Sequence, residues 1–175
     1  MINFDRLNYR TLQWLVAVFV LVHNLEEAIT MPSYVPEVRR RLSGVVLTTV
    51  FAATDNLSWF YIALVGATVI PAGIVLVATT GQPSRNTAWA VVFVEAVFLA
   101  NVVIPHLPAA LLLGGYAPGV VTAVCINLPY GVYFLWRSAR EGAVSRVGLG
   151  LALGLAVPAL VTGIGVLYLI VGWLV

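Results

Sequence analysis

The sequence predicts an all-α integral membrane protein, a bundle of about five transmembrane helices. The chain has 175 residues, of which 61% are hydrophobic and only 9% are charged, and its mean hydropathy is +1.00. A soluble domain of this size could not cover its surface with so few charged side chains. We therefore expect a single transmembrane helical domain over residues 1–175, with a short extra helix or re-entrant piece at 44–54.

The charged residues argue against a nucleic-acid partner. All nine basic residues are arginines and the formal net charge is only +2, which is too small for a nucleic-acid-binding surface. Cys125 is the single cysteine and lies inside an apolar run. It can form no disulfide within the chain, and we expect it to be a small packing residue.

The first span is expected from about Tyr9 to Thr30. Arg6 and Arg10 precede its apolar run, but no small-residue cleavage pattern follows that run. The segment therefore does not resemble a signal peptide that is removed, and we expect it to remain in the protein as a helix.

The second apolar region, about 44–80, is too long for one helix across ~30 Å of hydrocarbon. Asp55 and Asn56 interrupt it, and either side chain could cap a new helix. We expect a short helix or re-entrant piece over 44–54 and a full span over 57–80.

The remaining spans are expected at about 87–105, 118–136 and 147–174. The last of them contains several glycines and Pro158 but almost no polar side chain, so we assign it to helix packing.

Five spans place the two termini on opposite sides of the membrane. The side of the N-terminus would then carry six arginines and the other side three. Since cytoplasmic loops carry the excess of basic residues, we expect a multi-pass protein of the cytoplasmic membrane with its N-terminus in the cytoplasm.

The segment His23-Asn24-Leu25-Glu26-Glu27 places one imidazole and two carboxylates in the last third of the first span. A charge near the bilayer centre costs at least ~2.5 to 3.5 kcal/mol on insertion scales, so two adjacent acids imply a compensating partner. His23, Glu26 and Glu27 lie within one helix face, and their side chains could converge on a common point. This is the arrangement of a metal site or of an acid/base pair.

The third span supplies polar residues at a matching depth. Spans one and three would run in the same direction, and His23 and Asn101 each lie fourteen residues past the start of their span. His106 lies slightly further out and Glu95 further in. On an ideal helix Glu95 and His106 point the same way but are ~16 Å apart along the axis. We therefore expect His106 or Asn101 beside the first-span triad, with Glu95 beneath.

The fourth span adds Asn127 and Tyr130 on one face, which predicts a polar pocket between spans one, three and four. Other interpretations remain open. A transmembrane asparagine is often a hydrogen-bonding contact between helices, Glu95 could be a protonated carboxyl, and His106 could be an interfacial residue. The triad itself could form ion pairs with the Arg39-Arg40-Arg41 run.

The segment His23-Asn24-Leu25-Glu26-Glu27 resembles the signature of the HXXEE family of small bacterial integral membrane proteins. Glu95, Asn101 and His106 are similar to the second polar region of that family. The resemblance implies an active site at these residues, but no reaction, substrate or cofactor.

The residue types favour a metal-dependent enzyme. Neutral imidazoles and carboxylates are ligands for zinc or iron, and a divalent ion would offset the charge of intramembrane acids. We expect one or two ions, with hydrolytic or oxidative chemistry. The expected ligands are His23, Glu26, Glu27 and His106. Glu26, Glu27 and Glu95 are the expected catalytic acids.

A substrate would enter from the lipid, because the chain has no soluble domain to capture a polar molecule. We expect a lipid-like small molecule that contacts Asn101, Asn127, Tyr130 and Arg40. An arginine cluster near the mouth of the site could steer an anionic head group. A homo-oligomer is compatible with these expectations.

Two other functions stay open. A metal-free enzyme could use one carboxyl as acid and another as base on an isoprenoid-type lipid, as in an isomerase or cyclase. An ion-coupled transporter or binding protein could use the acids as a coupling-ion site, although the sequence shows no inverted repeat.

Overall fold

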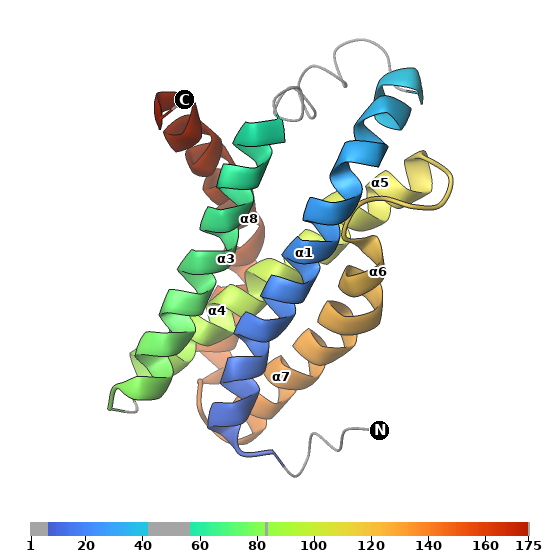
Figure 1. Ribbon diagram of the computed structural model, residues 1–175. Helices are drawn as coiled ribbons and strands as arrows, with labels where there is room; N and C mark the ends of the chain where they lie inside the picture. Colours follow the sequence, from blue (N-terminus) through green and yellow to red (C-terminus); the bar gives the residue numbers. More distant parts are fainter. Residues whose placement is uncertain (1–6, 42–56, 83, 175) are drawn as a thin grey trace.

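A computed structural model describes residues 7–41, 57–82 and 84–174 (Figure 1). All the regular elements in these ranges are helices. The search of the described residues finds five helical spans long and apolar enough to cross a membrane. The predicted fold class is thus confirmed, while the predicted piece at 44–54 lies outside the described residues.

The first span, α1 (Tyr9–Arg41), continues beyond the predicted end at Thr30. Pro32 lies inside it and has no N–H, so the carbonyl of Ala28 loses its donor within the helix. The hydroxyl of Tyr61, on the neighbouring α3, donates to this carbonyl at 3.2 Å. A neighbouring helix therefore compensates for the proline.

The second and fifth spans match their predicted ranges closely. They are α3 (Leu57–Thr80) and α8 (Arg146–Leu174). Both are apolar along most of their length, as expected for helices that face lipid on one side.

The third span is a run of three helical segments. It begins as α4 (Arg85–Asn101), continues as the π-helix η3 (Val102–His106) and ends as α5 (Leu107–Leu112). The Ser84 hydroxyl caps its start by accepting from the backbone N–H of Thr87 at 3.1 Å. The cap explains why the helix starts slightly before the predicted position.

The fourth span has the same composite build. It consists of α6 (Val120–Thr122), the π-helix η4 (Ala123–Asn127) and α7 (Leu128–Arg140). The two π-helices pack against each other. Single π-turns inside α-helices occur often at functional sites, and here one lies in each of two adjacent spans.

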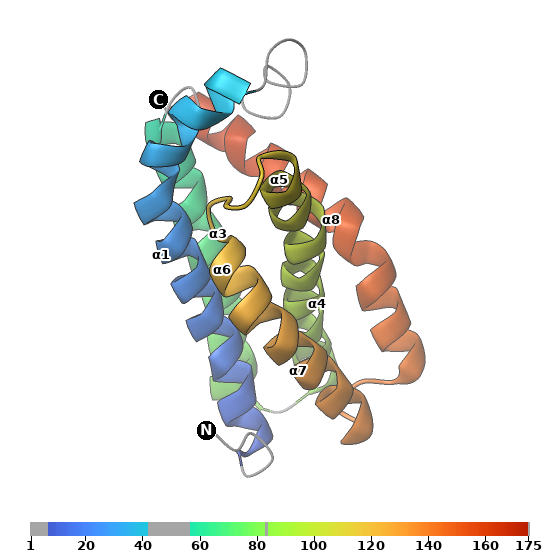
Figure 2. The ribbon, with the colours of Figure 1, turned by 90° about the vertical axis from the view of Figure 1, so that its right-hand side faces the viewer.

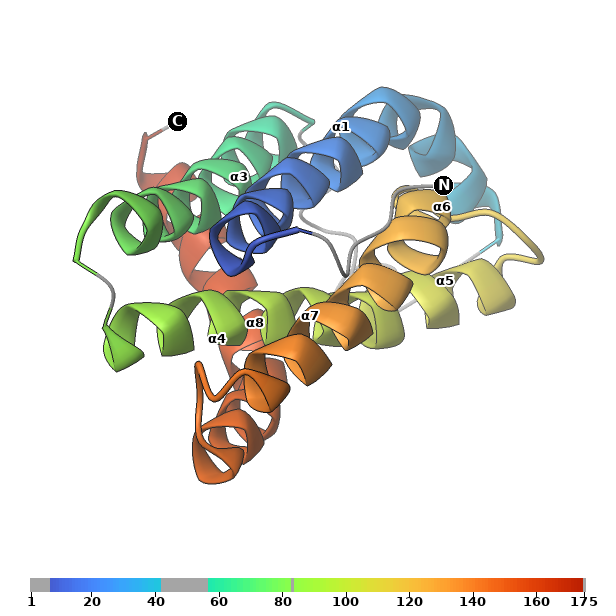
Figure 3. The ribbon, with the colours of Figure 1, turned by 90° about the horizontal axis from the view of Figure 1, so that it is seen from below.

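The helix α4 lies at the centre of the bundle and contacts α1, α3, α7 and α8 (Figures 2 and 3). Its valines pack into one core with side chains from all the other spans. A second, smaller apolar cluster joins the last turns of α1 to α5 and to the loop that follows it. The loop before α6 is thereby folded against α1.

Candidate metal centre

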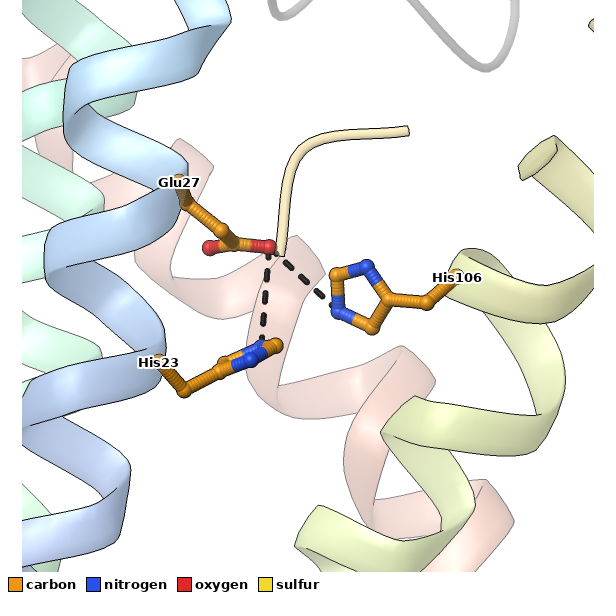
Figure 4. Close-up of side chains that lie close together, drawn as sticks. All are labelled: His23, Glu27 and His106. Atoms are coloured by element: carbon orange, nitrogen blue, oxygen red, sulfur yellow. Dashed lines mark ion pairs between the residues drawn. The ribbon is translucent and has the colours of Figure 1, made fainter. Parts of the chain in front are cut away.

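Three ionisable side chains from two spans converge inside the bundle: His23 and Glu27 from α1, and His106 from η3 (Figure 4). The Oε1 atom of Glu27 lies 3.8 Å from Nε2 of His23 and 3.4 Å from Nε2 of His106. One potential ligand atom from each residue lies within 4.8 Å of the others. Both imidazoles are buried, so the group could hold a metal ion shielded from bulk solvent.

The π-helix η3 determines which residues of the third span face this centre. Asn101 and His106 are five residues apart, which in an α-helix turns their side chains about 140° from each other. In a π-helix, residues five apart lie one turn apart and share a face. The Nδ2 atom of Asn101 accordingly lies 2.9 Å from Nε2 of His106 and 3.3 Å from Nε2 of His23. The predicted depth match of Asn101 with His23 is confirmed.

The hydrogen bond at Nδ1 defines the tautomer of His106. This nitrogen lies 2.9 Å from the carbonyl oxygen of Pro118. A carbonyl can only accept, so Nδ1 carries the proton and Nε2 has a free lone pair. Metal-binding histidines commonly donate their second ring N–H to a carbonyl in this way.

Thr122 defines the tautomer of His23, in which Nδ1 again carries the proton. The Thr122 hydroxyl donates its single proton to Oε2 of Glu26 at 2.6 Å. The hydroxyl oxygen then accepts from Nδ1 of His23, which is 2.9 Å away. Nε2 of His23 therefore also presents a lone pair, and the Nε2 atoms of both imidazoles lie within 4 Å of Oε1 of Glu27.

Glu26, which the sequence predicts to be a ligand and a catalytic acid, is not part of this cluster. Its carboxylate accepts from the backbone N–H groups of Val121 and Thr122 at 3.2 and 2.7 Å, and from the Tyr116 hydroxyl at 2.9 Å. Burial raises the pKa of Tyr116, which favours the protonated donor. A carboxylate at a helix N-terminus interacts favourably with the exposed N–H groups. Glu26 therefore fastens the start of α6 to α1.

Gly119 closes one side of the centre with its backbone. Its φ of +78° is left-handed, and a Cβ atom would lie 2.8 Å from Cε1 of both His23 and His106 and 2.9 Å from Cγ of Glu27. Only glycine fits here. The range expected for the fourth span, about 118–136, places Gly119 near the start of that span, and no pattern in the sequence indicates that the chain folds back onto the histidines at this point.

Glu95, another predicted catalytic acid, also lies outside the cluster. It is buried against α7, where a Cβ at Gly131 would collide with its Oε1 atom. The expectation that Glu95 and His106 share a face assumed an ideal helix. The extra residue in the turn of η3 rotates His106 relative to Glu95 by about 100°, so the two side chains face different neighbours.

Asn127 and Tyr130, predicted to bind substrate, are buried. The Tyr130 hydroxyl donates to the carbonyl oxygen of Leu12 and so ties α7 to α1. Among the described residues, Nδ2 of Asn127 has no hydrogen-bond partner. Neither side chain lines the cavity beside the centre. The cavity therefore does not lie between spans one, three and four, where the sequence predicted a pocket.

Arg40, also predicted to contact substrate, lies in the last turn of α1. Its guanidinium donates to both carboxylate oxygens of Glu37, at 2.8 and 2.6 Å. Thirteen residues separate it from Glu27, which is about 20 Å along a helix. Arg40 is therefore remote from the centre, and the side chains of its two arginine neighbours are not described.

A cavity of about 450 Å³ opens beside the centre, between α1, α3, the third span and α8. Its volume is typical of small-ligand sites. The polar side chains in its wall are Asn24, Glu27, Asn101, His106 and Tyr168; the rest of the wall is apolar. The fifth span, which the sequence assigned only to packing, thus forms one wall of this cavity.

Asn24 is a site residue that the sequence analysis did not select. Its Nδ2 donates to the Thr68 hydroxyl on α3 at 2.7 Å, and its side chain lines the cavity. Its position inside the motif was the available signal. An asparagine in the second position of this transmembrane motif needs a hydrogen-bonding partner on another helix, and Thr68 on α3 provides it.

A family model described as a protein of unknown function with HXXEE motif matches residues 14–134. The matched region runs from α1 into α7, so it includes His23, Glu27, His106 and the loop at Gly119. Comparison with curated proteins and with solved structures found no match. Because the family model covers more than half of the 175 residues, and its motif supplies two members of the cluster, this chain belongs to the HXXEE family.

Proposed function

We propose that this protein is an integral membrane enzyme that binds a divalent transition metal ion, zinc or iron, at His23, Glu27 and His106 and acts on a lipid-like substrate. One observation carries the proposal: two buried imidazoles with Nε2 lone pairs converge on one carboxylate oxygen.

The spacing of the donor atoms fits such an ion. Ligands about 2.0 to 2.1 Å from a tetrahedral zinc ion lie about 3.3 Å from one another. The distances from Glu27 Oε1 to the two imidazoles, 3.4 and 3.8 Å, require only a small contraction. The imidazole and carboxylate donor set also suits zinc or iron better than calcium or magnesium.

Three protein ligands are typical of catalytic rather than structural metal sites, because one position stays open. An ion held in this way supplies Lewis acidity to a carbonyl or hydroxyl group. Glu27 and His106 also line the cavity, so a molecule in the cavity would meet the open side of the centre. The chain's residues would bind the ion, orient the substrate and exclude water.

A metal-free acid/base enzyme is the second candidate. The Asn101 amide lies within hydrogen-bond distance of both Nε2 atoms and can donate one proton to each. The centre is therefore satisfied without an ion, and Glu27 could then exchange a proton with a substrate in the cavity.

Elemental analysis of protein purified without added metal and without a chelating resin tests the proposal. We expect about one transition metal ion per chain, with occupancy reduced at least tenfold in His23→Ala and Glu27→Gln, since each removes a ligand. Glu95→Gln is the control, because it removes a buried carboxyl outside the cluster and should leave metal content unchanged. A wild-type protein that is folded and active but free of metal would overturn the metal centre and favour the acid/base enzyme.

A further inference from the structure

We infer that the cavity between α1, α3, the third span and α8 binds one uncharged hydrocarbon chain that ends in an alcohol or carbonyl group. The inference rests on the proposed function for the role of the polar end, and it names the class of substrate. It replaces the expectation of an anionic lipid head group.

The wall of the cavity is apolar except at one end. Side chains such as Phe60, Ile70, Leu160 and Leu167 form most of it, and Glu27 belongs to the small polar group near the centre. A molecule that fits must therefore be apolar over most of its length and polar at one end. A volume of about 450 Å³ equals about 15 groups of the size of a water molecule, which is close to one hydrocarbon chain.

The charges around the polar end exclude an anionic head group. None of the arginines with described side chains lines the cavity, and Arg40 is paired with Glu37 near the end of α1. The formal charges beside the cavity are the carboxylates of Glu27, in the wall, and Glu26, behind Thr122.

A divalent ion would be balanced by these two carboxylates, so the centre would carry no net positive charge with the ion and a negative charge without it. In both states a phosphate or a fatty carboxylate would bring a further negative charge into a region of low dielectric that has no surplus positive charge to balance it. A hydroxyl or carbonyl oxygen has no such penalty, and it could approach the open side of the centre.

Two glycines on α8 provide a matched test. A Cβ atom at either Gly163 or Gly165 would meet no atom within 4 Å, so the first atom of a side chain can be added at both positions without a clash. Gly163 lines the cavity and Gly165 does not. Gly163→Phe should fill part of the cavity, whereas Gly165→Phe adds the same side chain to the same helix outside it.

The probes are hexadecanol with a photoreactive diazirine in its chain and the monophosphate of the same alcohol, each added to vesicles that contain the full protein. We expect the alcohol to label wild type and Gly165→Phe equally, with peptides of α3 or α8 carrying the label. Labelling of Gly163→Phe should be lower by roughly tenfold, because an overpacked site no longer admits the chain. The monophosphate should label wild type only as weakly as the alcohol labels Gly163→Phe.

Equal labelling of wild type and Gly163→Phe, or labelling by the monophosphate that matches the alcohol, would overturn the inference. Metal content measured on the same samples separates the two proposals. Site-specific labelling by the alcohol in metal-free protein would overturn the metal centre and leave the lipid site intact. Protein that holds a full complement of metal but shows no labelling that depends on Gly163 would overturn the lipid site and leave the metal centre intact.

Discussion

Glu26 and Glu27 are neighbours in the chain but have different surroundings. Glu27 lines the cavity and approaches two imidazoles, whereas Glu26 accepts hydrogen bonds from two backbone N–H groups and two hydroxyls. Hydrogen bonds to a charged group are worth about 1.5 to 3 kcal/mol each, so Glu26 is engaged in holding the loop before α6. The two acids of the motif thus differ in role: Glu27 is the candidate ligand, and Glu26 is a positioning residue that acts on His23 through Thr122.

Thr122→Val tests this relay. The substitution keeps the shape of the side chain but removes the oxygen that accepts from Nδ1 of His23. The imidazole is then free to change tautomer or rotate, and we expect metal affinity to fall by about 10- to 100-fold, as for other partners of metal-binding histidines. Competition with a chelator of known affinity measures the change.

Two further variants control for effects on folding. Thr122→Ser keeps the hydroxyl and should bind metal like wild type. Thr79→Val removes a buried hydroxyl that donates to the Val75 carbonyl of its own helix, and it should also leave affinity unchanged. If Thr122→Val bound metal as tightly as these controls, Thr122 would have no part in orienting His23.

At the scale of elements, the site depends on two departures from regular helix. The π-turn η3 brings His106 to the face of Asn101, and the loop after α5 places the Pro118 carbonyl and Gly119 against the two imidazoles. Both departures lie in the segment from η3 to α6, which returns the chain from the third span to the fourth. The position of this loop against α1 is therefore a condition for the centre to form.

Gly119→Ala should destroy the centre, and Gly142→Ala is its control. Both glycines have left-handed backbones, with φ of +78° and +70°, but a Cβ at Gly142 would meet no atom within 4 Å. Each variant should lose about 1 kcal/mol of stability from backbone strain. The Cβ at Gly119 would also displace the imidazoles, so we expect metal loss in Gly119→Ala alone. Thermal unfolding and elemental analysis of both variants measure the two effects, and equal metal content in both would contradict the close approach of the loop.

At the scale of the whole molecule, arginines are concentrated at one end of the bundle. The first turn of α1, the starts of α4 and α8 and the end of α7 meet at the same end (Figure 1), and they carry Arg10, Arg85, Arg137, Arg140 and Arg146. The last turn of α1 lies at the other end. That last turn carries Arg39, Arg40 and Arg41, so the excess is five arginines against three, and the prediction of a cytoplasmic first end rests on this excess.

Cysteine labelling tests the orientation. In a Cys125→Ser background we expect Arg40→Cys to react with a membrane-impermeant maleimide in intact cells, because its side chain is exposed at the far end of α1. Arg85→Cys, exposed at the opposite end, should react only after the membrane is permeabilised. The reverse pattern would invert the topology, and with it the side of the membrane nearer the metal centre.

Much of this architecture follows from sequence alone. The hydrophobic spans, their order and the family motif are local properties, because they depend on composition within about 20 residues and on the thickness of the bilayer. The same reasoning placed Asn101 at the depth of His23, since equal numbers of residues cover equal distances along parallel helices. These predictions need no knowledge of which helix faces which.

Only the tertiary structure shows which acid of the motif is the candidate metal ligand and which one binds the loop before α6. Adjacent carboxylates such as Glu26 and Glu27 differ in direction by about 100° around a helix, and which of them meets the imidazoles depends on where the loop before α6 lies. A single π-turn changes the face of every later residue, and it placed His106 on the face of Asn101 rather than on that of Glu95. The cavity could not be predicted either, because one of its walls is α8, a span whose own sequence shows only packing residues. A binding site is shaped by surfaces that are distant in the chain.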